Sequence, residues 1–239
     1  MTTTGQPAAS ADAVSPPATE NAKRKLLAAK FSTGLRAVDR VRRVQDRYHR
    51  RPPRPQARQS PGGVRVWAAG VGHIAAMRTI RLAGRITIVA RDQRRVGALA
   101  TRVKASGLDA RVGAADDVRD AELIVCATTA RTPLFDGRLV ADNSRVVAIG
   151  SHTADSRELD STLVGRTQLV VEDAVVARRE AGDLTIPIDE GTIEPTSLVP
   201  MRDIITGEAS VDHHRPRVFK STGMSWEDLV IAAEVYRAG

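Results

Sequence analysis

The pattern of apolar and polar positions changes sharply near residue 64. From there onward, short apolar or β-branched runs recur over 64–68, 85–90, 110–113, 123–127, 146–149 and 169–171. Stretches with helical spacing, 74–82 and 93–105, separate the first of these runs. Strands that alternate with helices in this way indicate a parallel sheet with helices on both faces. We therefore predict an α/β fold built on a doubly wound parallel sheet.

The first 63 residues follow a different pattern. Residues 1–20 are mostly Thr, Ala, Ser, Pro and Gly, and such a stretch buries too little apolar surface to offset its ordering entropy. Residues 21–49 carry apolar positions near helical spacing, and 50–63 form a Pro/Arg linker. We predict a disordered or partly helical basic extension and linker over 1–63, followed by one domain over 64–239 that ends in a returning helix.

The positive charge of the chain is concentrated in one segment. The chain carries +8 overall, but residues 23–58 hold 13 basic and two acidic residues, or 13 − 2 = +11. The remainder has 36 − 13 = 23 basic and 28 − 2 = 26 acidic residues, or −3. The basic segment could bind a nucleic acid or an anionic surface, but it has few stacking side chains and no recognised motif. We expect no specific nucleic-acid partner.

Cysteine content and hydropathy bear on the compartment. Cys126 is the one cysteine, so no internal disulfide can form. No apolar run approaches the ~20 residues that cross a bilayer, and the polar N-terminus lacks the apolar core of a signal peptide. We expect a cytoplasmic protein with no membrane partner, and we predict no metal site.

The segment VRVWAAGVGHIAAM has the order strand, glycine-containing turn, helix. In the dinucleotide fingerprint of Rossmann domains, glycines permit a tight turn and let backbone N–H groups reach the pyrophosphate at the helix N-terminus. Here Ala68 stands at the first glycine position, Gly70 at the second and His73 at the third, and Gly72 falls one residue early. The motif alone fits a phosphate loop through Gly70, Val71 and Gly72 and an ordinary strand–helix turn equally well.

The end of the second strand bears on the choice of dinucleotide. A cofactor without a 2′-phosphate typically meets an acidic residue there, whereas a 2′-phosphate favours arginine. Arg91 stands at this point, where its guanidinium could bind the phosphate through two hydrogen bonds, and Arg95 could add charge. Asp92 is either part of this site or only the N-cap of the next helix. We predict NADP(H) in preference to NAD(H).

The run 123–127 leads into Ala127, Thr128 and Thr129. In a doubly wound sheet, ligands bind beyond the carboxyl ends of the strands. Small residues and hydroxyl groups at such an end leave room for the ribose and nicotinamide of a dinucleotide. A strand that runs into a threonine-rich turn explains the pattern equally well.

Three downstream stretches carry a family resemblance: GSHTADSRELD over 150–160, REAGD over 179–183 and VFKSTGMSWED over 218–228. Their order and spacing resemble the ornithine cyclodeaminase/mu-crystallin family over about residues 64–239. The resemblance implies a Rossmann domain that binds NAD(P), homodimers formed through a separate N-terminal domain, and activities that include ornithine cyclisation, alanine dehydrogenation and reduction of cyclic ketimines. We therefore expect an oxidoreductase that acts on a small imine or amino acid, with a non-catalytic NADP(H)-binding protein or a truncated inactive member as the alternative.

The resemblance also implies further cofactor-binding residues. The turn that follows residue 219 approaches the nicotinamide end of the cofactor, where Lys220 and Ser221 could contact it and Gly223 lets the backbone come close. Ile149 and Gly150, at the end of the 146–149 run, join the same set of candidates.

His152 is the candidate catalytic residue. It stands where true ornithine cyclodeaminases carry the aspartate that handles the substrate amine, and the sequence around it is closer to the mu-crystallin and imine-reductase branch. Histidine exchanges protons near neutral pH, so His152 could donate one, although a loop histidine with one hydrogen bond explains it equally well. In the family, the N-terminal domain supplies the residues that bind the substrate carboxylate. Residues 1–63 lack the strand pattern of that domain, and we expect the domain to be missing here.

Overall fold

A computed structural model describes residues 64–69, 74, 83–224, 227, 229, 232–233 and 236–237. The extension predicted over 1–63, the glycine turn at 70–73 and most of the helix predicted over 74–82 lie outside these residues. The returning helix predicted at the end of the domain is described at only a few positions, which are helical. Within the described residues, no helix combines the length and the apolar character that a membrane span requires.

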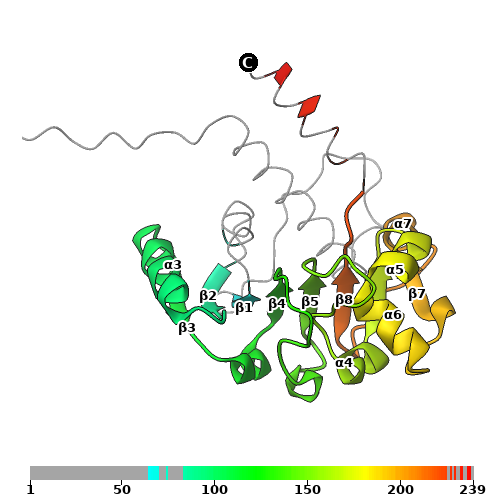
Figure 1. Ribbon diagram of the computed structural model, residues 1–239, viewed down its shortest axis with the longest axis horizontal. Helices are drawn as coiled ribbons and strands as arrows, with labels where there is room; N and C mark the ends of the chain where they lie inside the picture. Colours follow the sequence, from blue (N-terminus) through cyan, green and yellow to red (C-terminus); the bar gives the residue numbers. More distant parts are fainter. Residues whose placement is uncertain are drawn as a thin grey trace, which may run out of the picture.

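Eight parallel strands form a single sheet (Figure 1). The order across it is β3-β2-β1-β4-β5-β8-β6-β7. The strands are β1 (Val64–Ala69), β2 (Ala83–Ile88), β3 (Asp109–Val112), β4 (Leu123–Cys126), β5 (Arg145–Ala148), β6 (Gln168–Val171), β7 (Leu198–Pro200) and β8 (Arg217–Lys220). The order reverses between β1 and β4, which is the switch point of a doubly wound sheet. The predicted α/β fold is confirmed.

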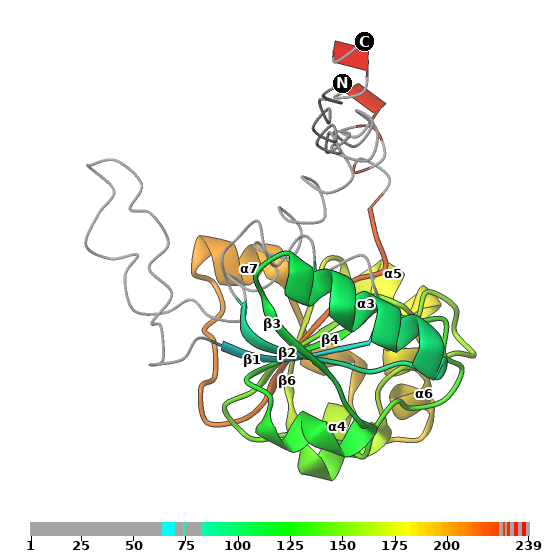
Figure 2. The same ribbon diagram turned by 90° about the vertical axis from the view of Figure 1, so that its left-hand side faces the viewer.

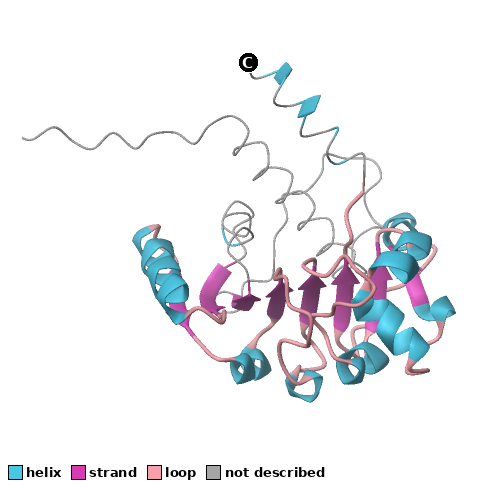
Figure 3. Cartoon of the chain, in the orientation of Figure 1, coloured by secondary structure: helices cyan, strands magenta, loops and turns pink. Residues whose placement is uncertain are grey.

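Helices cover both faces of the sheet, as Figures 2 and 3 show. The longest is α3 (Gln93–Ala105), which lies with α7 (Met201–Thr206) on one face. The helices α4 (Ser161–Arg166), α5 (Ala174–Glu180) and α6 (Gly182–Asp189) pack on the other. Three short 3-10 turns, η1 (Ala115–Asp120), η2 (Gly137–Leu139) and η3 (Pro195–Ser197), complete the connections.

The central strands are apolar because they are covered on both sides. All four residues of β4 are buried, and alternate residues enter two separate apolar clusters. Leu123 and Val125 face the cluster under α3, whereas Ile124 and Cys126 face the cluster under α4 and α6. This double burial explains the continuous apolar run that identified the strand in the sequence.

The helix α3 begins and ends where its sequence pattern predicts. Asp92 is its N-cap, and one carboxylate oxygen accepts hydrogen bonds from the backbone N–H groups of Arg94 and Arg95 at 3.0 and 3.2 Å. The buried side chains are Val96, Leu99, Ala100 and Val103, which recur at helical spacing. The interpretation of Asp92 as a helix cap is therefore confirmed.

Candidate functional site

A cleft of about 660 Å³ opens at the carboxyl ends of β2 and β4. Its walls come from residues 88–92, from residues 127–134, from one side of α3 and from Trp67 in β1. Because β1 lies between β2 and β4, the cleft lies at the point where the strand order reverses, the usual ligand site of this architecture. Its volume lies within the ~300–1,000 Å³ typical of small-molecule sites.

Six residues predicted separately from the sequence line this one cleft: Arg91, Asp92, Arg95, Ala127, Thr128 and Thr129. The Arg91 side chain is exposed and makes no hydrogen bond or ion pair with another described residue. The Arg95 guanidinium is also exposed, with its Nε atom 3.2 Å from a carboxylate oxygen of Asp92. Both cations are therefore open to a ligand anion at the β2 side of the cleft.

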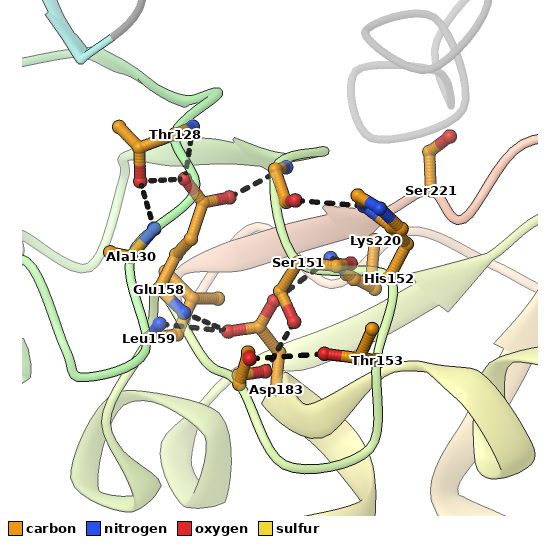
Figure 4. A network of polar contacts seen from close by, with 12 residues as sticks. Thr128, Ala130, Ser151, His152, Thr153, Glu158, Leu159, Asp183, Lys220 and Ser221 are labelled. Carbon is orange, nitrogen blue, oxygen red and sulfur yellow. Dashed lines mark hydrogen bonds and ion pairs between the residues drawn. The ribbon is translucent and has the colours of Figure 1, made fainter.

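A buried carboxylate, Glu158, joins the loops that follow β4 and β5 (Figure 4). One of its oxygens accepts hydrogen bonds from the backbone N–H of Thr128 at 2.6 Å and from the Thr128 hydroxyl at 2.8 Å. The other oxygen accepts from the backbone N–H of Gly150 at 2.7 Å. Since Thr128 also lines the cleft, Glu158 connects the cleft wall to the end of β5.

An ion pair lies beneath this carboxylate. Asp183, near the start of α6, and Lys220, at the end of β8, are 2.9 Å apart, and both side chains are fully buried. The other oxygen of Asp183 accepts from the backbone N–H groups of Glu158 and Leu159 at 2.6 and 2.8 Å. The Lys220 ammonium also donates to the Ser151 carbonyl. These two partners occupy two of the three N–H donors of the Lys220 ammonium.

Burial sets the protonation of the groups near this network. Desolvation raises the pKa of the Glu158 carboxyl above its ordinary value, against the hydrogen bonds from Thr128 and Gly150, and the nearby Asp183 raises it further. Burial also raises the pKa of the Cys126 thiol, with additional contributions from Glu158 and Asp183. Cys126 is therefore a neutral, inert core side chain.

His152 lies on the exposed surface of the loop that Gly150 begins. Its Nδ1 atom is 3.1 Å from the Gly150 carbonyl oxygen (Figure 4). A carbonyl oxygen only accepts hydrogen bonds, so the ring proton lies on Nδ1 in this contact and Nε2 is left for proton exchange. The single hydrogen bond also fits the alternative of an ordinary loop histidine.

The turn after β8 is held by a carboxylate that the sequence motifs did not single out. One oxygen of Glu172, which directly follows β6, accepts from the Ser221 hydroxyl at 3.0 Å and from the Gly223 backbone N–H at 3.1 Å. Gly223 has a φ of 90°, a left-handed conformation that favours glycine. The turn thus lies beside the end of β5, where the Ser221 N–H donates to the Ala148 carbonyl at 3.0 Å.

The predicted residues therefore fall into two adjoining groups. The first lines the cleft at β2 and β4, and the second surrounds the neighbouring ends of β5 and β8: Ile149, Gly150, His152, Lys220, Ser221 and Gly223. Gly70, Val71 and Gly72 lie outside the described residues. Glu158 and Asp183 lie within the family motifs, but their role as buried acceptors was not predicted. The signal available in the sequence was the presence of an acidic residue inside each of the two family motifs, 150–160 and 179–183.

Comparison with known proteins shows to which of them the chain is related. The model of the ornithine cyclodeaminase/mu-crystallin family matches residues 68–238. The chain belongs to this family. A Δ1-pyrroline-2-carboxylate reductase of Colwellia psychrerythraea is 34% identical over 122 residues, which are 50% of this chain and 39% of that protein. The ketimine reductase mu-crystallin of Mus musculus is 32% identical over 119 residues, 50% of this chain and 36% of that protein. The matched part is thus about two fifths of these relatives' length.

Solved structures have the same fold. The Δ1-pyrroline-2-carboxylate reductase of Thermococcus litoralis, solved with NADH and L-proline, has a TM-score of 0.74 at 19% identity, over 91% of this chain and 64% of that one. A probable ornithine cyclodeaminase from Bordetella pertussis has a TM-score of 0.69 at 25% identity, over 90% of this chain and 65% of that one. The Rossmann-like fold is confirmed.

Gly150 provides a test of how closely the two loops must approach. A Cβ atom added there would overlap the carbonyl oxygen and the amide nitrogen of Thr128, which are backbone atoms and cannot rotate away. We expect Gly150→Ala to lower the free energy of unfolding by about 1–3 kcal/mol. The control is Gly97→Ala in α3, where an added Cβ meets nothing within 4 Å, and a gain of roughly 0.5–1 kcal/mol is expected. Urea unfolding measures both; a Gly150→Ala protein as stable as the parent would contradict the close contact.

Proposed function

We propose that this chain binds NAD(P)(H) at the carboxyl ends of β2, β4 and β5 and serves in the reduction of a small cyclic imine to an amino acid. The observation that carries the proposal is the cleft at the strand-order reversal, with Arg91 and Arg95 at one side and the loop after β4, which Glu158 holds at Thr128, at the other. Family membership supports the chemistry, since curated relatives are named Δ1-pyrroline-2-carboxylate reductase and ketimine reductase.

The described residues fit such a cofactor. Two exposed guanidinium groups suit a phosphate, because arginine binds phosphate oxygens through two parallel hydrogen bonds. At the other end, Ala127, Thr128 and Thr129 line the cleft with small side chains. The bound nicotinamide would supply the hydride for the imine carbon.

The chain must then supply a proton to the imine nitrogen. His152 is exposed in the loop that follows β5, and its Nε2 atom lies on the other side of the ring from the Nδ1 contact with the Gly150 carbonyl. An imidazolium donates from Nε2 while Nδ1–H stays on that carbonyl, which keeps the ring orientation through the transfer. We assign the proton-donor role to His152 on this basis.

A second candidate function is dinucleotide binding without catalysis. Lys220, the cation next to this loop, is fully buried and its charge is compensated by Asp183, which leaves it poorly placed to bind a substrate carboxylate. The matched portion of the curated relatives is also only about two fifths of their length. Both functions predict that the chain binds the cofactor, but only the first predicts that it turns over a substrate.

Turnover separates these two functions. We expect the purified chain to consume NADPH with Δ1-pyrroline-2-carboxylate and to form proline, followed by NADPH absorbance and by product analysis. His152→Ala should lower the rate by roughly 10²–10⁴-fold, as loss of a general acid does, with NADPH affinity unchanged. His214→Ala, an exposed histidine before β8, is the matched control. NADPH binding with no proline formed would reject the reductase in favour of the non-catalytic binder.

Arg91 tests the choice of dinucleotide. We propose NADPH as the preferred cofactor, because Arg91 follows β2 where a 2′-phosphate would lie. Loss of a hydrogen bond to a charged group costs about 1.5–3 kcal/mol, so Arg91→Ala should weaken NADPH about 10–100-fold and NADH little. Arg102→Ala, an exposed arginine of α3 outside the cleft, should change neither affinity. Equal affinity of the parent for both cofactors, or equal losses in Arg91→Ala, would contradict the assignment.

A further inference from the structure

We propose that Glu158 is a positioning residue, whose carboxylate fixes the loops after β4 and β5 at the spacing that a dinucleotide requires. The role of these loops in binding rests on the proposed function. That Glu158 holds the loops together is inferred from its hydrogen bonds within the chain. We call Glu158 with its acceptor contacts to Thr128 and Gly150 the carboxylate clamp.

The clamp brings together segments that are distant in sequence. Thr128 lies 30 residues before Glu158, and Gly150 lies eight residues before it, yet both donate to the same carboxylate at 2.6 to 2.8 Å. Three donors satisfy the two oxygens, and the Thr128 hydroxyl accepts in turn from the Ala130 N–H at 3.2 Å. One side chain therefore joins the two loops.

The clamp is itself held in place from below. The backbone N–H groups of Glu158 and Leu159 donate to Asp183, which pairs with Lys220. Lys220 donates to the carbonyl of Ser151, the residue next to Gly150. The loop after β5 is thus bound at two consecutive residues, by the clamp at Gly150 and by Lys220 at Ser151.

The clamp requires an ionised carboxylate. An ionised carboxylate only accepts hydrogen bonds, and all its partners here, from Thr128 and Gly150, are donors. An amide or a protonated acid would instead place one of its own hydrogens against one of these N–H groups. The charged and titratable groups that face it are Asp183 from α6, Lys220 from β8 and Cys126 from β4. Burial raises the pKa of Glu158. As the pH is lowered, the carboxyl should therefore take up its proton, and the clamp should open, at a higher pH than if the pKa had its ordinary value.

This raised pKa makes stability and binding respond to pH in opposite directions. A carboxyl whose pKa is higher in the folded than in the unfolded chain binds its proton more tightly when folded. Its contribution to stability is therefore present below the unfolded value and is lost as pH rises through the folded value. The loops, by contrast, are held only after the proton leaves. Dinucleotide affinity should rise over the pH range in which this contribution to stability falls.

Glu158→Gln in the full chain tests the clamp, because it keeps the size of the side chain and replaces an acceptor with a donor. We expect amide hydrogen exchange, measured by NMR without cofactor, to accelerate at least about tenfold at Thr128 or at Gly150, whichever N–H faces the new amide nitrogen, as loss of a hydrogen bond worth about 1.4 kcal/mol implies. NADPH affinity should fall by a similar factor. Glu122→Gln, just before the other end of β4 and paired with Arg65, is the matched control and should change neither.

Separate readouts keep the two proposals distinguishable. Unchanged exchange in Glu158→Gln, or lost protection with unchanged NADPH affinity, overturns the role of Glu158. A parent chain that binds no dinucleotide overturns the proposed function, and the exchange rates still decide whether the clamp exists. If Glu158→Gln does not fold, the parent chain provides the test: protection at Thr128 and Gly150 and affinity for NADP+ should decline together as the pH is lowered. Protection that stays constant while affinity declines overturns the clamp.

Discussion

The buried ion pair between Asp183 and Lys220 is the interaction on which the site geometry depends. Removing two charges from water costs several kcal/mol for each ion, and the pair is tolerated only when further hydrogen bonds satisfy both groups. Here Asp183 accepts from two backbone N–H groups, and Lys220 also donates to the Ser151 carbonyl. These contacts fix α6, the end of β8 and the loop after β5 relative to one another. Glu158 then extends the same set of contacts to the end of β4.

Thr128 connects the two halves of the candidate site. Its side chain and backbone bind Glu158, while the same residue lines the cleft that Arg91 bounds on the far side. A ligand that spans the cleft would therefore contact an exposed, cationic side set by β2 and a rigid side set by buried carboxylates. This division suits a dinucleotide, whose phosphates need cations and whose reactive ring needs a fixed position.

Much of the fold could be predicted from the sequence, because its strands are buried on both faces and its longest helix has a clear cap. The run 123–127 and the Asp92 cap gave β4 and α3 nearly to the residue. The helices α4–α7 were not predicted because six to eight residues are too few to display a helical period, and β7 has only three residues. The strand β8 was not predicted because Arg217 and Lys220 leave only two apolar residues between them. Arg91 and Thr128 could be predicted as site residues because each lies shortly after the end of a predicted strand. The roles of Glu158 and Asp183 could not be predicted in this way, because Thr128 lies 30 residues from Glu158 and Lys220 lies 220 − 183 = 37 residues from Asp183, and only folding brings them together.

The most direct test of the account is to map the bound dinucleotide on the chain by amide chemical shifts. NADP+ should shift the amides of Arg91, Thr128 and Gly150, at the carboxyl ends of β2, β4 and β5, in a saturable manner. Glu122 and Arg145, near the opposite ends of β4 and β5, should keep their shifts. Saturable shifts confined to that opposite edge of the sheet, or no shifts at all, would contradict the assignment of this cleft as a dinucleotide site.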